Sequence, residues 1–468
     1  MHLTAQVADF LTRVGEAEIP IEVRRLAKRS ILDGLGLAVA GSRSTAATIA
    51  RAEIESYGDL RPEATVLGTD LRAPARFAAF LNGLAIHADD FDDTQLAVSS
   101  DRVYGLLTHP TASVLPPVLA LAERLGSSGS DVLRSYLAGV EVETKVAEAI
   151  DPRHYDMGFH STATAGSIGA GGASAAILGL DADATAVALG IAASQAGGLR
   201  ENFGTMTKPF HAGRAAENGV LAANLAAAGF TAAHNILEAR RGFFQAAGGG
   251  YDQSMIAGRL GSPWTFADPG ISIKPHPSGS LTHPAMGAFL DLVVASDIRA
   301  DDVRRIRVGT NRHMPNALIH SRPQTGLEAK FSMEFCLAIL LLERQAGLAE
   351  FTDEVVGRPD VHQVIDKITF EADPAADEGG FRAMTSLIDV ELVDGRMLTT
   401  RAAFARGSPS NPMSDEELIG KFLACLAWRG IPEAVGRTVA DRVLNLENEP
   451  TMDDIVRPLR LEAAGVAA

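Results

Sequence analysis

The sequence predicts a mainly α-helical protein in which a smaller α+β domain is inserted into a large all-helical domain. Apolar residues recur at the three-to-four spacing of buried helical faces through most of the N-terminal half. Alternation of apolar and polar residues, which is typical of half-buried strands, is confined to a segment between about residues 300 and 405. We expect the first part of the helical domain over residues 1–269, the α+β domain over 270–407 and a helical return over 408–468.

Local signals give the order of the helices. Pro20 opens one of them, Pro116 and Pro117 are expected to start or kink another, and Ser130 or Asp131 is expected to cap a third. Helices are predicted over residues 7–14, 20–41, 73–86, 111–125, 130–150, 181–197 and 215–229. The glycine-rich stretch 157–180 is interpreted as closely packed small-residue helix and turn.

The second half of the chain adds strands. Strands are predicted over residues 303–310, 385–393 and 397–404, the last two forming a hairpin around Asp394-Gly395-Arg396. Helices are predicted between the strands at residues 328–342 and 359–365. Ser414 and Glu417 have the spacing of a capping box and open a further helix.

Length, charge and cysteine content limit the class of protein. A chain of 468 residues exceeds one typical domain, so two domains are expected. The formal net charge of −16 argues against nucleic acid or a membrane surface as partners, because both need clustered Lys and Arg. Cys336 and Cys425 lie in apolar helical contexts and are expected to be buried thiols. No signal peptide or membrane span is predicted, so we expect a cytoplasmic protein.

The segment from His87 to Thr94 places four carboxylates and an imidazole directly after an apolar helix. An uncompensated buried carboxylate is costly, so this acidic octet faces water, binds a cation or lies in a polar cavity beside positive groups. Asp residues at a helix C-terminus oppose the macrodipole and repel one another, so local stability gives no reason for them. The pattern favours a functional role over a solvated helix end.

Four other stretches place His or Lys in turns at predicted helix starts. They are residues 108–111, 158–162, 207–214 and 274–284. A single His beside Pro is more often a hydrogen-bonded turn residue, and a single Lys is usually a solvated charge. Their recurrence favours a common site, because catalytic groups and anion sites concentrate in loops and at helix N-termini.

The same residues are compatible with other classes of function. The Asp-Asp-x-x-Asp pattern at 89–93 is the one with which class I terpene synthases hold magnesium against a diphosphate. Aromatic residues make up only 6% of the chain and no second magnesium pattern is found, so this is a remote alternative. Zinc is poorly supported, because no His pair at helical spacing joins a third ligand. A helical binding module without catalysis is a further alternative.

Together, the octet and the four stretches resemble the MmgE/PrpD family, which includes 2-methylcitrate dehydratase, cis-aconitate decarboxylase and iminodisuccinate epimerase. The resemblance runs nearly end to end and includes the Thr-Gly-Leu-Glu-Ala-Lys-Phe-Ser run at 325–332. It implies a helical domain with an α+β lid, a homodimer, and a cofactor-independent site in the cleft between the domains. Carried over position by position, the catalytic residues would be Asp90, His109, His160, Lys208 and Lys274.

The resemblance also implies a set of substrate-binding residues and no metal ligand. The substrate-binding residues would be His87, Asp93, Thr94, His211, His276, Ser278 and His320. His276 and His320 stand where many relatives have tyrosine, which bears on the choice of substrate. The implied partner is a small di- or tricarboxylate, and the implied enzyme is a lyase (a dehydratase or a decarboxylase) with an epimerase as the alternative.

The chemistry of such reactions explains these residue types. Removing a proton beside a carboxylate generates a carbanion or enediolate, so a base must approach while cations or donors stabilise the developing charge. Lys208 and Lys274 suit binding of carboxylates, and Asp90 with His109 or His160 would act as base and acid. The same arrangement serves a dehydratase, a decarboxylase or an epimerase, so the sequence leaves these reactions open.

Overall fold

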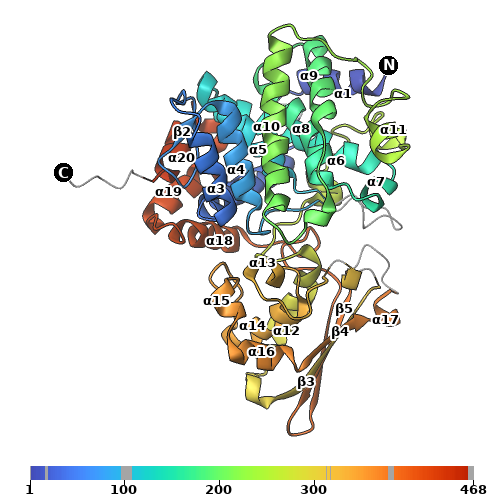
Figure 1. The fold of residues 1–468 in the computed structure, drawn as a ribbon, viewed down its shortest axis with the longest axis vertical. Coiled ribbons are helices and arrows are strands. Elements are labelled where there is room, and N and C mark those ends of the chain that lie inside the picture. Colours follow the sequence, from blue (N-terminus) through green and yellow to red (C-terminus); the bar gives the residue numbers. More distant parts are fainter. Residues whose placement is uncertain are drawn as a thin grey trace, which may run out of the picture.

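The computed structural model describes residues 2–15, 19–95, 108–312, 314–316, 318–377 and 384–461. The protein is mainly helical, as predicted, and the strands in this part of the chain form one short pair and one four-stranded sheet. Figure 1 shows a larger helical region and, below it, a smaller region in which helices pack beside the sheet.

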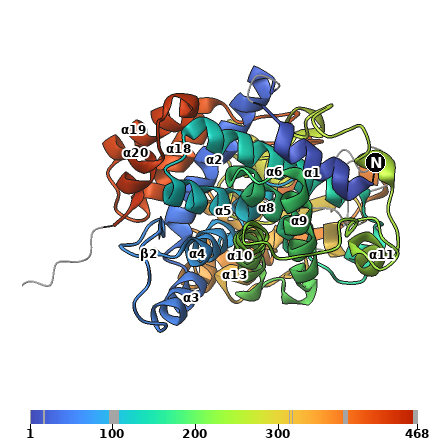
Figure 2. The same ribbon diagram turned by 90° about the horizontal axis from the view of Figure 1, so that it is seen from above.

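The helical region is built from segments at both ends of the chain. Its N-terminal helices are α1 (Leu3–Arg13), α2 (Ile21–Gly41), α3 (Thr45–Glu55), α4 (Ala75–His87), α5 (Pro110–Leu125), α6 (Gly129–Ala149), α7 (Arg153–Asp156), α8 (Ser161–Ile177), α9 (Ala182–Gln195), α10 (Thr207–Ala227) and α11 (Phe243–Gly248). Its C-terminal helices are α18 (Asp415–Ala427), α19 (Glu433–Leu444) and α20 (Asp453–Val456). In Figure 2, α5, α8 and α10 lie in the middle, between the C-terminal helices on one side and α1 and α11 on the other.

The α+β region lies between these two sets of helices in the sequence. Its helices are α12 (His283–Ala295), α13 (Gly326–Ala329), α14 (Met333–Glu343), α15 (Asp353–Val356), α16 (Pro359–Ile365) and α17 (Pro374–Asp377). Its strands are β3 (Val303–Thr310), β4 (Ile368–Ala372), β5 (Ser386–Leu392) and β6 (Met397–Ala402). The order across the sheet is β4-β3-β5-β6, in which β3 and β4 are parallel and the other two pairs are antiparallel.

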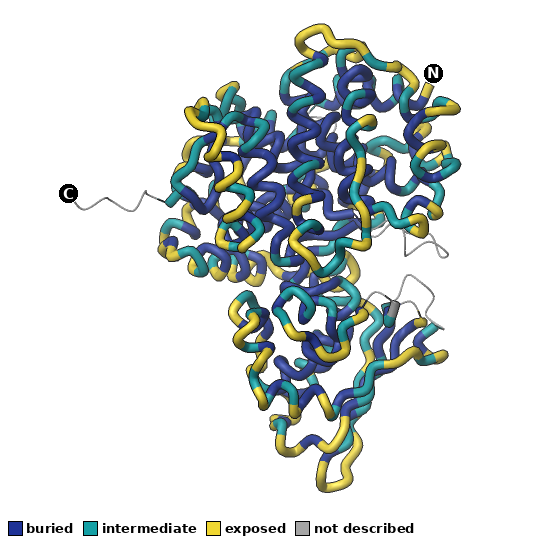
Figure 3. Tube along the Cα trace, in the orientation of Figure 1, coloured by how far each residue is buried: buried dark blue, intermediate teal, exposed yellow. Residues whose placement is uncertain are grey.

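Each region has its own hydrophobic core. In the helical region, Leu35 of α2, Leu84 of α4 and Phe422 of α18 belong to one buried cluster, so the C-terminal helices complete the core that the N-terminal ones begin. In the α+β region, Phe289 of α12 and Ile306 of β3 belong to a separate cluster. The middle helices of the larger region are buried along most of their length (Figure 3).

Most predicted elements are confirmed, and the differences have local causes. The cap of α6 is Ser128, whose side chain accepts the Asp131 N–H, so the predicted cap at Ser130 or Asp131 was wrong. Pro116 and Pro117 lie inside α5, within the predicted range 111–125. The predicted helix over 328–342 is two helices, because Ser332 caps α14 after a break.

Some elements were missed or misplaced. Helix α10 begins at Thr207 rather than Ala215, and α3, α12 and strand β4 were not predicted. A two-residue pair, β1 (Ala64–Thr65) and β2 (Arg72–Ala73), lies in the half where no strand was expected. The hairpin of β5 and β6, the capping box of Ser414 and the burial of both cysteines are confirmed. Within the described residues, no helix combines the length and apolar character needed to cross a bilayer.

Helices α4 and α10 pack closely because glycine lies at their crossing. A Cβ atom added to Gly213 of α10 would lie 2.5 Å from the backbone oxygen of Phe80 and 3.1 Å from Cβ of Leu84. A Cβ added to Gly83 of α4 would lie 3.1 Å from Cα of Gly213. This contact brings the end of α4, with His87, toward the first turn of α10.

We predict that Gly213→Ala destabilises the protein by ~1–3 kcal/mol, because the added methyl group overpacks the crossing and its nearest neighbour is backbone. The matched control is Gly420→Ala in α18, where an added Cβ has no atom within 4 Å. There the higher helix propensity of alanine should stabilise by ~0.5–1 kcal/mol. Urea unfolding measures both, and equal stability of the Gly213 variant and the wild type would contradict the packing account.

Candidate active site

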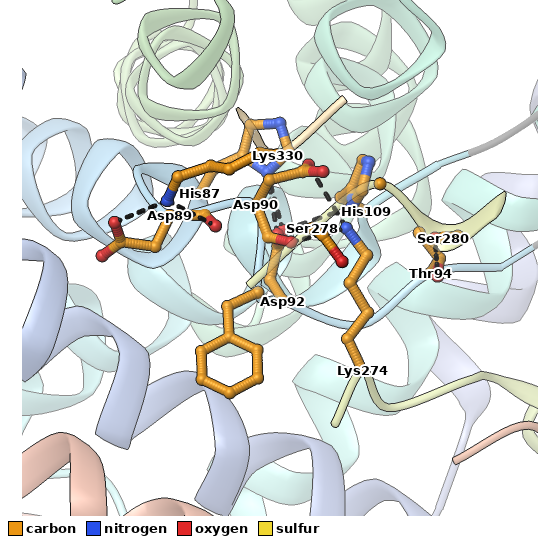
Figure 4. A network of polar contacts seen from close by, with 12 residues as sticks. His87, Asp89, Asp90, Asp92, Thr94, His109, Lys274, Ser278, Ser280 and Lys330 are labelled. Carbon is orange, nitrogen blue, oxygen red and sulfur yellow. Dashed lines mark hydrogen bonds and ion pairs between the residues drawn. The ribbon is translucent and has the colours of Figure 1, made fainter. Parts of the chain in front are cut away.

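The acidic octet follows α4 and is held from three directions by buried lysines. Three successive backbone carbonyls accept one ammonium group each: Asp89 O from Lys330 at 2.9 Å, Asp90 O from Lys274 at 2.8 Å and Phe91 O from Lys421 at 2.8 Å. Lys330 lies in the turn before α14, Lys274 in the segment between α11 and α12, and Lys421 in helix α18, so distant parts of the chain meet here. Figure 4 shows Lys274 and Lys330 beside the octet.

Asp90 is the centre of the charges. Its side chain is 7% exposed and pairs with the Lys208 ammonium group and with that of Lys274, whose Nζ lies 3.2 Å from Oδ1. Burial opposes ionisation of Asp90, but the charges of Lys208 and Lys274 hold the pKa of its carboxyl well below the usual range. Asp90 also has a φ of +50°, a left-handed conformation that non-glycine residues adopt mostly at functional or constrained sites.

Asp92 holds two imidazoles in place. Its carboxylate lies 2.8 Å from His87 Nδ1 and 3.4 Å from His109 Nδ1, and the His109 nitrogen also lies 3.1 Å from the Asp93 carbonyl oxygen. Burial lowers the pKa of His87 to about 3 and also lowers that of His109. Both rings are therefore neutral near pH 7, and a neutral ring that donates from Nδ1 leaves Nε2 as a bare acceptor. His87 Nε2 is buried, and among the described residues it has no hydrogen-bond partner.

A second pair of histidines lies beside the first. The His160 and His211 rings share a hydrogen bond between their Nδ1 atoms at 3.1 Å. The ring of His160 is 5.9 Å from that of His87 and 6.4 Å from that of His109, centroid to centroid. The structure thus brings together the five residues predicted to be catalytic, which are Asp90, His109, His160, Lys208 and Lys274. His87 and His211, which were predicted to bind substrate, lie among them.

The other predicted residues lie around this centre or turn away from it. Thr94 Oγ1 lies 3.1 Å from Ser280 Oγ (Figure 4), and Ser278 bonds to Thr282 and His283. Asp93 accepts bonds from the N–H and hydroxyl of Thr111. His276 bonds through Nδ1 to the Ala346 carbonyl, and the His320 ring approaches Gly204.

The sequence reasoning assigned no role to three residues of this network. Asp92 lies in the octet, but nothing in the sequence separates it from its three acidic neighbours. Lys330 lies in the run at 325–332, which signalled the family resemblance without a role for that lysine. Lys421 pairs with Asp33 at 2.7 Å inside the helical core, and no local pattern marks it.

Within the part of the chain that the structure describes, two groups of side chains have the spacing of metal ligands. Ligand atoms of His87, His109 and His160 lie within 4.8 Å of one another, and so do those of His87, Asp90, Asp92 and His109. In the second group, Asp90 is already paired with the ammonium groups of two lysines, and the Asp92 carboxylate is already bonded to two imidazoles. Because those ammonium groups would repel a cation at either place, we assign no metal here.

Comparison with known proteins agrees with this architecture. The fold and site define a mainly helical protein that has a larger helical region, a smaller α+β region and a buried cluster of acid–base side chains. The chain matches the MmgE/PrpD N-terminal domain over residues 5–255 and the MmgE/PrpD C-terminal domain over residues 276–446. The chain therefore belongs to the MmgE/PrpD family, as the resemblance indicated.

Two relatives of the chain are cis-aconitate decarboxylases. The chain is 31% identical to cis-aconitate decarboxylase of Homo sapiens over 420 residues, which cover 86% of this chain and 84% of the relative. It is 28% identical to cis-aconitate decarboxylase of Aspergillus terreus over 474 residues, which cover 95% and 93% of the two chains. These similarities support a lyase-type function.

Replacing Asp92 by Asn should lower turnover by at least ~10²-fold, because the amide no longer selects the ring tautomers that leave Nε2 bare on His87 and His109. Asp89→Asn is the matched control, since Asp89 pairs with Lys330 and its side chain is 25% exposed. A much smaller loss is expected there. Turnover and ¹⁵N-imidazole spectra test both, and unaltered imidazole signals in Asp92→Asn would contradict this role.

The buried carboxyl group of Glu143 in α6 should make the stability of the protein depend on pH. Burial raises the pKa of Glu143 to about 8, although the Ser113 hydroxyl donates to it at 2.5 Å. Between the unfolded pKa of ~4.3 and the folded value, only the folded state keeps this proton, so the free energy of unfolding falls as the pH rises.

Glu143→Gln keeps an acceptor for Ser113 and removes the ionisation. We therefore predict a smaller loss of stability between about pH 5 and about pH 9 than in the wild type. Urea unfolding at both pH values measures it, with Glu416→Gln at the exposed start of α18 as the control for lost charge. The same pH dependence in the Glu143 variant and the wild type would refute this role for Glu143.

Proposed function

We propose that this protein is a cofactor-independent lyase that acts beside a carboxylate of a small di- or tricarboxylate, with decarboxylation of a cis-aconitate-like acid as the first candidate. One observation carries the proposal: the buried Asp90 holds the ammonium groups of Lys208 and Lys274 beside a cluster of neutral imidazoles. Similarity to cis-aconitate decarboxylases favours decarboxylation over dehydration, and an epimerase is the alternative.

The lysines are suited to binding an anionic substrate. The whole chain carries a formal charge of −16, so a polycarboxylate must be attracted by positive charge within the site. Lys208 and Lys274 together carry two positive charges against the single charge of Asp90. An incoming carboxylate can therefore share these ammonium groups with Asp90, and it would complete their charge balance.

Proton transfer falls to the imidazoles in this proposal. The two lysines hold the pKa of Asp90 well below the usual range, which makes its carboxylate a weak base and a good counter-ion. His109 and His160 are neutral because burial lowers both pKa values, so each can accept a proton or donate one through a ring nitrogen. They would act as the acid–base pair, with the lysines stabilising the developing negative charge.

When the carbon–carbon bond to the leaving carboxylate breaks, its electron pair stays on carbon and carbon dioxide departs. The developing carbanion is stabilised by the neighbouring carboxylate and the ammonium groups, and an imidazole N–H then protonates the carbon. Each turnover consumes one proton, whereas dehydration and epimerisation consume none.

The α+β region would serve as a lid in this proposal. Its core is separate from that of the helical region, and Lys330 reaches from it to Asp89 of the octet. Movement of this region would thus change the setting of the octet as well as the access of substrate.

Proton NMR in D₂O, with EDTA present, tests the reaction. We expect cis-aconitate to lose carbon dioxide and to gain deuterium on carbon, whereas citrate, 2-methylcitrate and iminodisuccinate stay unchanged. New vinyl signals from citrate or 2-methylcitrate would indicate a dehydratase. Deuterium beside a carboxylate with an intact skeleton would indicate an epimerase, and activity lost in EDTA would contradict cofactor independence.

Lys208→Met should lower kcat/KM for cis-aconitate by at least ~10²-fold, because both substrate binding and charge stabilisation lose an ammonium group. Lys28→Met is the control, since it removes an ammonium group that pairs with Glu447 outside the site. Weakened binding with no turnover in any variant or in the wild type would favour a binding module instead.

A further inference from the structure

His160 and His211 are joined by a direct ring-to-ring hydrogen bond. His160 precedes α8, and His211 lies in the second turn of α10, so the pair links two helices that pack against each other. The Nδ1 atoms are 3.1 Å apart, which requires one ring to donate and the other to accept. Each ring then has its Nε2 atom free of this bond.

The two rings lie at different depths. His160 is 1% exposed and lies among the rings of His87, His109 and Phe203. His211 is 4% exposed and lies directly under the chain at Gly198, where an added Cβ would come within 3.1 Å of its ring. The neighbouring residues reach the protein surface: Leu199, which follows Gly198, is 55% exposed, and Phe210, which precedes His211, is 41% exposed.

We propose that His211 is a positioning residue that relays protons between the surface and His160. The proposal rests on the proposed function and goes beyond it, since it assigns the group that gives His160 a proton as this buried acid protonates the substrate. The observation behind it is the juxtaposition of a fully buried ring in the acid–base cluster and a ring just under the surface.

The relay balances without any further reactant. His160 gives its Nε2 proton to the substrate carbon and takes the Nδ1 proton of His211 into the shared hydrogen bond. His211 then takes a proton from water or buffer at Nε2, and its Nδ1 is left bare. After the product leaves, water that enters the emptied site protonates His160 at Nε2, the Nδ1 proton passes back to His211, and His211 releases its Nε2 proton to the surface. Both rings then have their first tautomers again, and the net uptake over the cycle is the single proton that decarboxylation consumes.

The surroundings keep the relay from storing a proton. Burial lowers the pKa of His160 well below its usual value, and the charge of Lys208 lowers it further. Burial, followed by the charge of Lys208, lowers the pKa of His211 to about 4. The neutral rings of His87 and His109 lie beside His160, and Lys208 lies on the same helix as His211, so the charge of Lys208 disfavours a lasting positive charge on either ring.

The experiment compares His211→Gln with the wild type in the decarboxylation of cis-aconitate. We expect kcat to fall toward the ~10²-fold loss typical of a missing acid–base group while KM changes little. Added imidazole buffer should restore kcat in proportion to its concentration, because a free imidazole can deliver the proton that His211 delivered. The control is His154→Gln, which removes a buried ring bonded to Ala247 and Thr164, and imidazole should not change its rate.

A purely structural role predicts something else. If His211 only orients His160, imidazole would not raise kcat of His211→Gln at any concentration, and this result would overturn the relay. An active wild type with an unimpaired His211→Gln enzyme would overturn it as well. An inert wild type would instead contradict the proposed function, and the relay with it.

A measurement without substrate checks the hydrogen bond itself. In ¹⁵N-histidine spectra, the Nδ1 signal of His160 should shift when His211 is replaced by Gln, since the ring loses its imidazole partner. An unshifted signal would overturn the proposal whatever the substrate is.

Discussion

The attachment of three buried lysines to three successive carbonyl groups is the constraint on which the site depends. Lys330, Lys274 and Lys421 bond to the oxygens of residues 89, 90 and 91, and they come from the turn before α14, the segment before α12 and helix α18. In an isolated peptide, the four carboxylates in the turn after the helix would repel one another. Here the three lysines bond to the turn, in which Asp90 has a left-handed backbone conformation.

Burying so many charges requires partners, and the small residues of the helical region make the partners reachable. The glycines at the crossing of α4 and α10 let the end of one helix approach the start of the other, so Lys208 can pair with Asp90. The bias toward Ala and Gly is thus linked to the site as well as to the core. Removing one member of a buried ion pair typically costs ~3–5 kcal/mol, so these residues matter for stability and for chemistry together.

The sequence predicted what is encoded locally. Helix periodicity located α2 and α16, alternation located β3, and the Asp394-Gly395-Arg396 turn located the hairpin, because each depends on neighbours in the chain. The cap at Ser128, strand β4 and the break before α14 depend on choices between similar nearby residues or on pairing with distant strands. In the site, Lys421 carried no signal, since its partners Asp33 and Phe91 lie more than 300 residues away.

Catalysis by this site, as proposed, requires that the ammonium groups around Asp90 bind substrate carboxylates. A crystal structure with tricarballylate, a tricarboxylate without the double bond of cis-aconitate, tests this most directly. We predict one of its carboxylates within hydrogen-bonding distance of Lys208 or Lys274, with the adjacent carbon beside His109 or His160. Tricarballylate bound elsewhere, with both lysines still on Asp90 alone, would contradict the account.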